Sequence, residues 1–371
     1  MIMHRKVKGV RLAPKANGEI NKRTLFVLAV DFEVAEELTP GTGQRKVQIT
    51  RRKGVNKMGL TNNAKVYLEA FYSGPKKIQD LTAEEARQMM SLAPVPENVE
   101  VPPVAKVEDR QIPVDGGEIT ARIYTPSGQG PFPLFVYYHG GGWVLGNLET
   151  SDAGCRLLAE KTGRVVVSVD YRLAPEFKFP VPVEDSYNAL CWARDNASQL
   201  NAIAEDIVVG GDSAGGNLAT VMAILSNDNN GPTITAQALI YPVTNLDFTS
   251  PSYEKFADGY GLDRDLMIWF GEYYVNNEEE FNDPLVSPLL YENVNALPPA
   301  IIVAAENDVL FSEGVQYQEK LEQAGVEVKH TIIEGSIHGF FSNMVIFADE
   351  TKATVDQIAN YLKTVKTNVS N

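Results

Sequence analysis

The segment GDSAG (211–215) is the part of this sequence best suited to chemistry. It has the G-x-S-x-G pattern, follows an apolar run typical of a strand and precedes a helical pattern. Glycines permit the sharp, strained turn that exposes a serine hydroxyl, and a helix N-terminus favours negative charge. A tight packing turn is the alternative, but this context favours Ser213 as a nucleophile. A phosphate-binding loop is excluded because Asn217 and Leu218 stand where Lys and Ser or Thr are needed.

A run of glycines in HGGGW (139–143) ends another strand-like segment. Consecutive glycines let backbone N–H groups approach a substrate oxygen, which larger residues would block. We therefore predict that the amides of Gly141, Gly142 and Ala214 form an oxyanion hole, which binds the negative oxygen of a tetrahedral intermediate. A flexible turn is the simpler alternative. His139 is interpreted as a structural residue that shapes this loop.

The general base is predicted by elimination among four histidines. His4 lies in an atypical N-terminal segment, His139 begins the glycine run, and His330 lies within a strand-like run. His338 follows the last strand-like run in a short loop, GSIHGF (335–340), with glycines on both sides. Histidine is the commonest base for a serine nucleophile, so His338 is the predicted base.

Two carboxylates compete for the role of the acid that orients the histidine. A fold with this serine turn orders its triad as serine, acid, histidine, and the segment after AIIVAA (300–305) offers Glu306 and Asp308. Asp308 lies further past the strand end, where a loop can turn it toward His338, so it is favoured over Glu306. Its predicted role is to orient the imidazole and stabilise the imidazolium.

No pattern in the sequence indicates a metal or a cofactor. Cys155 and Cys191 are the only cysteines, which gives neither zinc spacing nor a disulfide framework, and both are expected as buried thiols. No two histidines are four residues apart, and no dinucleotide-binding glycine motif follows a strand. We predict no cofactor and no metal.

Strand-like and helical segments alternate along most of the chain. This alternation predicts an α/β fold with a mostly parallel central sheet and helices on both faces. Ligands on such sheets bind beyond the carboxyl ends of the strands, where each motif above is found. The strand-like runs are 119–126, 133–140, 164–172, 206–212, 234–242, 300–306 and 326–333. The helical patterns are 152–162, 183–199, 214–227, 312–324 and 348–363.

Additional helices fall outside this alternation and are predicted to form a cap over the site. Two lie at 64–74 and 82–92, and the second begins with a capping box formed by Thr82 and Glu85. A third, at 262–275, belongs to an insertion at about 243–285. The large apolar side chains expected to build the cap are Tyr67, Phe71, Met89, Met90, Trp269 and Phe270.

Charge divides the chain unevenly. Residues 1–60 hold 13 Lys and Arg against 5 Asp and Glu, a net of +8, and because the whole chain carries −15, the remainder carries −23. Such an acidic body disfavours nucleic acid and anionic lipid as partners. The predicted division is a basic extension at 1–57, cap helices at 58–105 and a catalytic domain at 106–371. Residues 1–57 show no sustained hydrophobic periodicity, and the sequence from Met58 resembles the natural start of a protein.

A membrane span is not expected, since no apolar run approaches 18 residues. The apolar run at 24–30 leads into acidic residues instead of a small-residue cleavage site, so it is not interpreted as a signal peptide. A cytoplasmic location is expected, with secretion left open. The expected partner is a small molecule, and a homodimer is left open.

These motifs together resemble the bacterial hormone-sensitive lipase family of α/β-hydrolases. The resemblance begins at about Ala64 and continues to the C-terminus; residues 1–57 have no counterpart in the family. Val309 stands where the family usually has proline, which leaves the acid in place. The matching segments are HGGGW (139–143), DYRLAPE (170–176), GDSAGGN (211–217), AENDVL (305–310) and HGF (338–340).

The resemblance implies an α/β-hydrolase fold with a helical cap. It also implies a triad of Ser213, Asp308 and His338, with Gly141 and Gly142 as oxyanion donors. The implied activity is that of a carboxylesterase, which hydrolyses short- to medium-chain acyl esters through an acyl-enzyme intermediate.

Two other functions use the same scaffold. An amidase or deacetylase could employ the same triad, because no motif distinguishes an alcohol from an amine leaving group. A non-catalytic ligand receptor exists on this scaffold in plants, but it lacks the histidine that His338 supplies here. The sequence does not specify the natural substrate, the preferred acyl length or the oligomeric state.

Overall fold

The computed structural model describes residues 59–74, 76–91 and 101–365, together with the backbone of three short strands before residue 52. The main sheet has eight strands: β4 (Lys106–Val114), β5 (Gly117–Thr125), β6 (Phe132–Tyr138), β7 (Val165–Asp170), β8 (Ala202–Asp212), β9 (Ile234–Ile240), β10 (Ala300–Asn307) and β11 (Val328–Ile337). Their order is β11-β10-β9-β8-β6-β7-β5-β4. β5 runs antiparallel to both of its neighbours, and every other adjacent pair is parallel.

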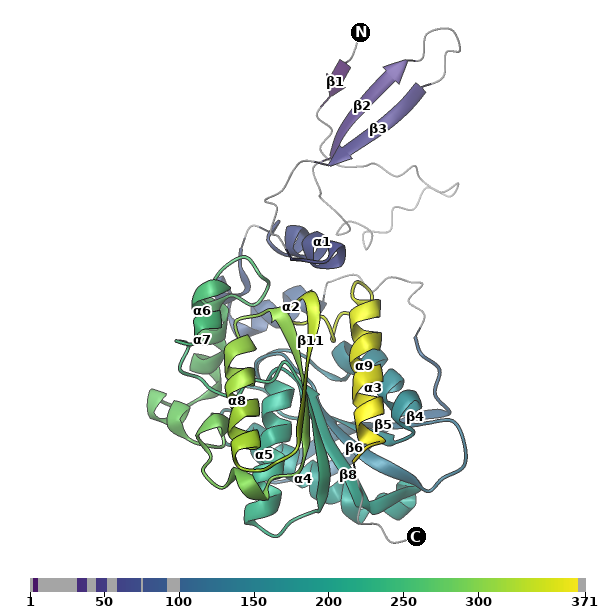
Figure 1. Cartoon of the computed structure of the whole chain (residues 1–371), viewed down its shortest axis with the longest axis vertical. Coiled ribbons are helices and arrows are strands. Elements are labelled where there is room, and N and C mark those ends of the chain that lie inside the picture. Colours follow the sequence, from purple (N-terminus) through teal and green to yellow (C-terminus); the bar gives the residue numbers. More distant parts are fainter. Residues whose placement is uncertain are drawn as a thin grey trace.

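Both faces of this sheet are buried under helices. The helices are α3 (Leu148–Thr162), α4 (Val181–Asp195), α5 (Ala214–Asp228), α8 (Phe311–Gln323) and α9 (Ala348–Leu362). Side chains alternate along β6: Leu134, Val136 and Tyr138 enter one apolar core, and Phe135 and Tyr137 enter the other. Helices α4, α5 and α8 cover the first face, and α3 and α9 cover the second (Figure 1). The predicted α/β-hydrolase architecture is thus confirmed.

Strand β4 was not predicted. It joins β5 through a two-residue turn at Asp115 and Gly116, with Val114 opposite Gly117 and Gly116 at φ +76°. An Asp-Gly pair is a strong hairpin signal, and in this turn Gly116 is the residue that takes the positive φ. Most side chains of β4 are exposed or half-buried, so the strand lacks the apolar run that identifies the inner strands.

The additional helices are present outside the alternation of strands and helices. The predicted ones are α1 (Asn62–Phe71), α2 (Ala83–Ser91) and α7 (Arg264–Tyr274). Helix α6 (Pro251–Lys255) was not predicted, and α6 and α7 both lie between β9 and β10. The predicted capping box begins α2: the Glu85 amide donates to Thr82 Oγ1 at 3.2 Å, and the Thr82 amide donates to Glu85 Oε2 at 2.9 Å. Residues 92–100, between α2 and β4, lie outside the described residues. No helix in the described part of the chain has the length and apolarity needed to cross a membrane.

The N-terminal segment contains strands that its sequence pattern did not predict. β1 (Met3–Arg5), β2 (Phe32–Leu38) and β3 (Arg45–Arg51) form a separate antiparallel sheet. In the backbone register, Glu37 lies opposite Lys46. The apolar run at 24–30 lies outside the described residues.

Candidate active site

Three side chains from the carboxyl ends of three strands meet at one point. Ser213 follows β8, Asp308 follows β10 and His338 follows β11. His338 Nε2 lies 2.8 Å from Ser213 Oγ, and His338 Nδ1 lies 2.7 Å from Asp308 Oδ2. Asp308 is 2% exposed and Ser213 is 7% exposed. In this arrangement the imidazole can accept the serine proton while the carboxylate accepts a hydrogen bond from Nδ1–H.

The backbone at Ser213 is strained in the way a nucleophilic turn requires. Its φ of 57° and ψ of −121° lie outside the regions that non-glycine residues ordinarily occupy. A Cβ atom at either Gly211 or Gly215 would overlap the carbonyl oxygen of Tyr138, at the end of β6. Only glycine fits at these two positions, which explains the G-x-S-x-G spacing. Ser213 then stands at the start of α5, which begins at Ala214.

The glycine loop lies in backbone conformations that only glycine adopts readily. Gly141 has φ +116° and Gly142 has φ +60°. A Cβ at Gly141 would overlap the Leu145 carbonyl, and a Cβ at Gly142 would overlap the ring of Phe270. Among the described residues, no atom accepts a hydrogen bond from the amides of Gly141, Gly142 or Ala214. The hydrogen-bonding capacity of these three amides is therefore unused within the described part of the chain.

A buried carboxylate connects this loop to the serine turn, and sequence reasoning did not identify it. Asp212 Oδ1 accepts hydrogen bonds from the Tyr137 hydroxyl at 2.6 Å and from the Gly140 amide at 2.8 Å. Burial raises the pKa of Asp212, and these two hydrogen bonds act to lower it. The sequence did contain a signal for this role. Asp212 is a charged residue inside the serine pentapeptide, beside a turn that has to be buried.

His139 lies in the glycine loop and not in the triad. Its Nδ1 lies 2.8 Å from the Gly140 carbonyl oxygen, and its ring stacks on Tyr171 at a centroid distance of 4.4 Å. The Tyr171 hydroxyl donates to the His139 carbonyl at 2.8 Å. Burial lowers the pKa of His139, which favours a neutral ring. His139 therefore contributes to the shape of the loop.

The alternative acid, Glu306, contacts a different part of the histidine loop. Its side chain points away from the core, and its Oε2 accepts a hydrogen bond from the Gly335 amide at 2.6 Å. Gly335 lies three residues before His338, so Glu306 restrains the backbone of this loop. The structure brings Asp308, and not Glu306, to the imidazole.

The remaining histidine and cysteine side chains that could bind a metal are scattered. His330 is half-buried in β11, and burial lowers the pKa of its ring. Cys155 is buried and Cys191 is partly buried, and both are free thiols. Within the described ranges, no group of three or more His, Cys, Asp or Glu side chains is placed to hold a metal ion.

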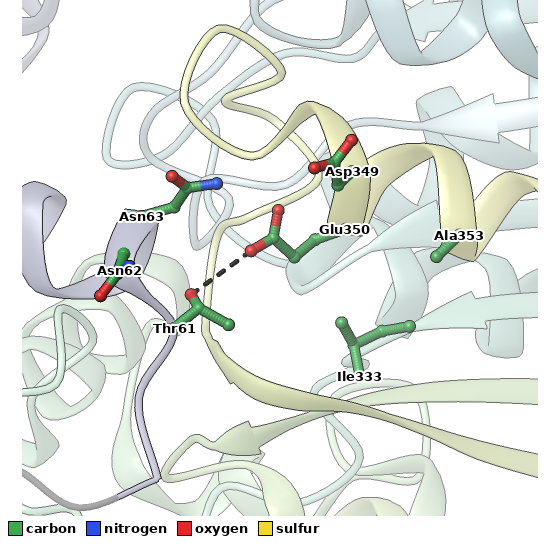
Figure 2. A pocket seen from close by; sticks show the side chains of 7 residues that line it. All are labelled: Thr61, Asn62, Asn63, Ile333, Asp349, Glu350 and Ala353. Carbon is green, nitrogen blue, oxygen red and sulfur yellow. Dashed lines mark hydrogen bonds between the residues drawn. The ribbon is translucent and has the colours of Figure 1, made fainter.

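A surface pocket of about 390 Å³ lies apart from the triad (Figure 2). It lies between the N-terminus of α1 and the first turn of α9, where Thr61 Oγ1 donates to Glu350 Oε1 at 3.3 Å. Acidic side chains in a first helical turn are stabilised by the helix dipole, so Asp349 and Glu350 have a structural explanation. The lining residues are Thr61, Asn62, Asn63, Ile333, Asp349, Glu350 and Ala353, none of which belongs to the triad.

Comparisons with known proteins show which family this chain resembles. The profile of a family described by the alpha/beta hydrolase fold matches residues 135–342, a segment that includes Ser213, Asp308 and His338. An arylesterase of Saccharolobus solfataricus is 37% identical over 290 residues, which cover 77% of this chain and 94% of that protein. The carboxylesterase NlhH of Mycobacterium tuberculosis is 40% identical over 261 residues, 69% of this chain and 82% of that protein.

Solved structures of esterases also resemble this chain. A thermostable esterase from Pseudomonas putida ECU1011 superposes with a TM-score of 0.80 at 31% identity, over 86% of this chain and 100% of that one. A hyperthermophilic esterase from Pyrobaculum calidifontis superposes with a TM-score of 0.77 at 39% identity, over 83% of this chain and 99% of that one. With its serine turn, glycine loop and histidine motif, the chain belongs to the α/β-hydrolase family, in its hormone-sensitive-lipase-like branch.

Proposed function

We propose that this chain hydrolyses carboxylic esters with Ser213 as nucleophile, His338 as general base and acid, and Asp308 as the orienting carboxylate. The observation that carries the proposal is the hydrogen-bonded series Ser213–His338–Asp308. The arylesterase and carboxylesterase relatives support an ester as the substrate.

The first half of the reaction acylates the serine. Ser213 Oγ attacks the ester carbonyl carbon while His338 Nε2 takes the hydroxyl proton. The carbonyl oxygen becomes an oxyanion that accepts hydrogen bonds from the amides of Gly141, Gly142 and Ala214. The bond to the alcohol oxygen then breaks, and His338 gives its proton to that oxygen. An acyl-enzyme and a free alcohol result.

The second half releases the acid. Water attacks the acyl-enzyme carbonyl while His338 takes one of its protons, and the same amides bind the second oxyanion. The bond to Ser213 Oγ breaks, and His338 returns the proton to the serine. Asp308 stabilises the imidazolium in both halves without taking its proton.

The proposed substrates carry short to medium acyl groups. Helix α7 lies against the glycine loop, where the Phe270 ring contacts Gly142 and Tyr274 stacks on Trp143 at a centroid distance of 4.2 Å. Bulky aromatic side chains this close to the proposed oxyanion site restrict the space for a long acyl chain. This enclosure supports small esters over long lipids as substrates.

Ser213→Ala tests the proposal with 4-nitrophenyl acetate and butyrate and with the matched 4-nitroanilides. The wild-type protein is expected to cleave the esters faster than the anilides, and Ser213→Ala to lose about 10⁴-fold or more in kcat. Ser198→Ala, at an exposed serine in a short surface helix, is the matched control and should keep wild-type rates. Preferential anilide cleavage would make the protein an amidase, and an active Ser213→Ala protein would rule out the assigned nucleophile.

A further inference from the structure

Arg87, on α2, makes four polar contacts with two loops distant in sequence. Its Nε donates to the Val144 carbonyl at 2.8 Å, and its Nη2 donates to the Ala174 carbonyl at 2.5 Å. Its guanidinium also forms a two-pronged pair with Glu176, with both N–O distances at 2.9 Å. The planar fork of arginine suits several acceptors at once, which a lysine ammonium cannot match.

The first of these carbonyls belongs to the glycine loop. Val144 lies in a tight turn in which its own amide donates to the Gly141 carbonyl at 3.1 Å, and the Leu145 amide donates to the same oxygen at 2.8 Å. The Ala174 amide donates to the Trp143 carbonyl at 2.9 Å. Arg87 therefore bonds both to the glycine turn and to the segment that supports it.

This contact region is buried, which makes the loss of a donor costly. Val144 and Ala174 are fully buried, and Ala86, one residue before Arg87, is also buried in the same core. A buried carbonyl left without a donor destabilises the conformation that buries it. Without Arg87, the turn would relax toward another conformation or admit water.

The glycine turn has particular need of external support. Glycine loses more conformational freedom on folding than any other residue, and Gly141 and Gly142 both lie at positive φ. An oxyanion hole works only if its donors stay about 2.7–3.1 Å from the oxyanion. In this loop the flexible residues are the proposed donors, so their positions depend on the contacts around them.

We propose that Arg87 is a positioning residue that holds the amides of Gly141 and Gly142 in their working orientation. It does so through the Val144 and Ala174 carbonyls, and docking of α2 thereby assembles the oxyanion hole. The inference rests on the proposed function, since it concerns the same reaction. Arg87 acts on the transition state through the loop and makes no contact with the substrate.

The test compares Arg87→Met with wild type on 4-nitrophenyl butyrate and on a trifluoromethyl ketone, which adds to the serine and mimics the tetrahedral intermediate. Arg87→Met should lower kcat by about 10- to 100-fold, the scale of a small misplacement of catalytic groups, and should leave KM nearly unchanged. Inhibition by the ketone should weaken by a similar factor, because transition-state binding is what is lost. Amide hydrogen exchange at 140–146 should become faster.

Three further variants separate positioning from general stability. Arg87→Lys keeps the positive charge but not the planar forked donor, so its kcat should lie between those of wild type and Arg87→Met. If the methionine variant does not fold, Arg87→Lys carries the test. Glu176→Gln leaves both carbonyl contacts of Arg87 and should lose less kcat than Arg87→Met. Arg194→Met removes a surface ion pair with Asp195 and should have the kcat and ketone inhibition of wild type.

Two results would overturn the inference alone. One is an Arg87→Met enzyme with wild-type kcat and ketone inhibition; the other is a loss that appears only in KM, which would make Arg87 a substrate-binding residue. A wild-type protein that hydrolyses neither ester nor anilide would instead overturn the proposed function together with this inference.

Discussion

Asp308 and Glu306 are separated by one residue, yet they bond to different parts of the loop that carries His338. Asp308 accepts from the imidazole at 2.7 Å, and Glu306 accepts from the Gly335 amide at 2.6 Å. Loss of charge should therefore have different consequences at the two positions. A carboxylate at the imidazole selects the tautomer, whereas an acceptor for a backbone amide needs only an oxygen.

We predict that Asp308→Asn lowers kcat by up to about 10⁴-fold, because an amide at this position favours the wrong histidine tautomer. Glu306→Gln retains an oxygen for the Gly335 amide and should change kcat by no more than a fewfold. The measurement is steady-state hydrolysis of 4-nitrophenyl butyrate by both variants, with unfolding followed by circular dichroism. A larger loss of kcat in Glu306→Gln would show that the acid is wrongly assigned.

Among the elements, α2 and α7 approach the glycine loop in different ways. Helix α2 reaches the loop with the polar group of Arg87, and α7 packs the rings of Phe270 and Tyr274 against it. The two segments also bond to each other, since Trp269 Nε1 on α7 donates to the Leu81 carbonyl just before α2, at 3.2 Å. These contacts support the predicted cap. Its predicted side chains are not equally buried, however, because Met89 and Met90 are more than 40% exposed.

Phe270 is therefore the side chain of the predicted cap best placed to limit acyl length. Phe270→Ala should open space beside Gly142 and shift preference toward longer acyl chains, by about 1–3 kcal/mol for the methylene groups accommodated. Met90→Ala, at an exposed position on α2, is the control and should leave the profile unchanged. The profile is kcat/KM across 4-nitrophenyl esters of increasing acyl length. If both variants keep the wild-type profile, Phe270 does not set the limit.

For the molecule as a whole, the sheet brings the reacting groups together. The triad residues follow strands β8, β10 and β11, whose carboxyl ends meet at one edge because these strands are parallel. The glycine loop follows β6, the neighbour of β8. Among the described residues, every contact assigned to the reaction lies between residues 81 and 340.

We predict that deletion of residues 2–57 leaves ester hydrolysis within about a factor of two. The deletion should shift the midpoint of thermal unfolding by only a few degrees, which corresponds to a change of about 1 kcal/mol in the free energy of unfolding of a domain of this size. Full-length and truncated proteins would be compared side by side for kcat and for thermal unfolding. A truncated protein that aggregates or loses most of its activity would show that the extension is part of the working enzyme.

Local patterns in the sequence were sufficient to predict the alternating architecture, the serine turn and the glycine loop. These features depend on short-range spacing and periodicity, such as the glycines around Ser213 and the apolar runs of the inner strands. β4 was missed because Pro113 and its charged neighbours hide the strand period, although the Asp-Gly turn beside it was visible.

Only the tertiary structure decided which distant groups meet. The sequence favoured Asp308 as the partner of His338, and the tertiary structure set Asp308 on the imidazole and assigned Glu306 to the Gly335 amide. The tertiary structure also placed Arg87 on the Val144 carbonyl, across 57 residues of chain. Such contacts depend on the path of the chain and on how helices pack on the sheet. Local propensity carries no information about either, so the contacts of Arg87 and Glu306 could not be read from sequence.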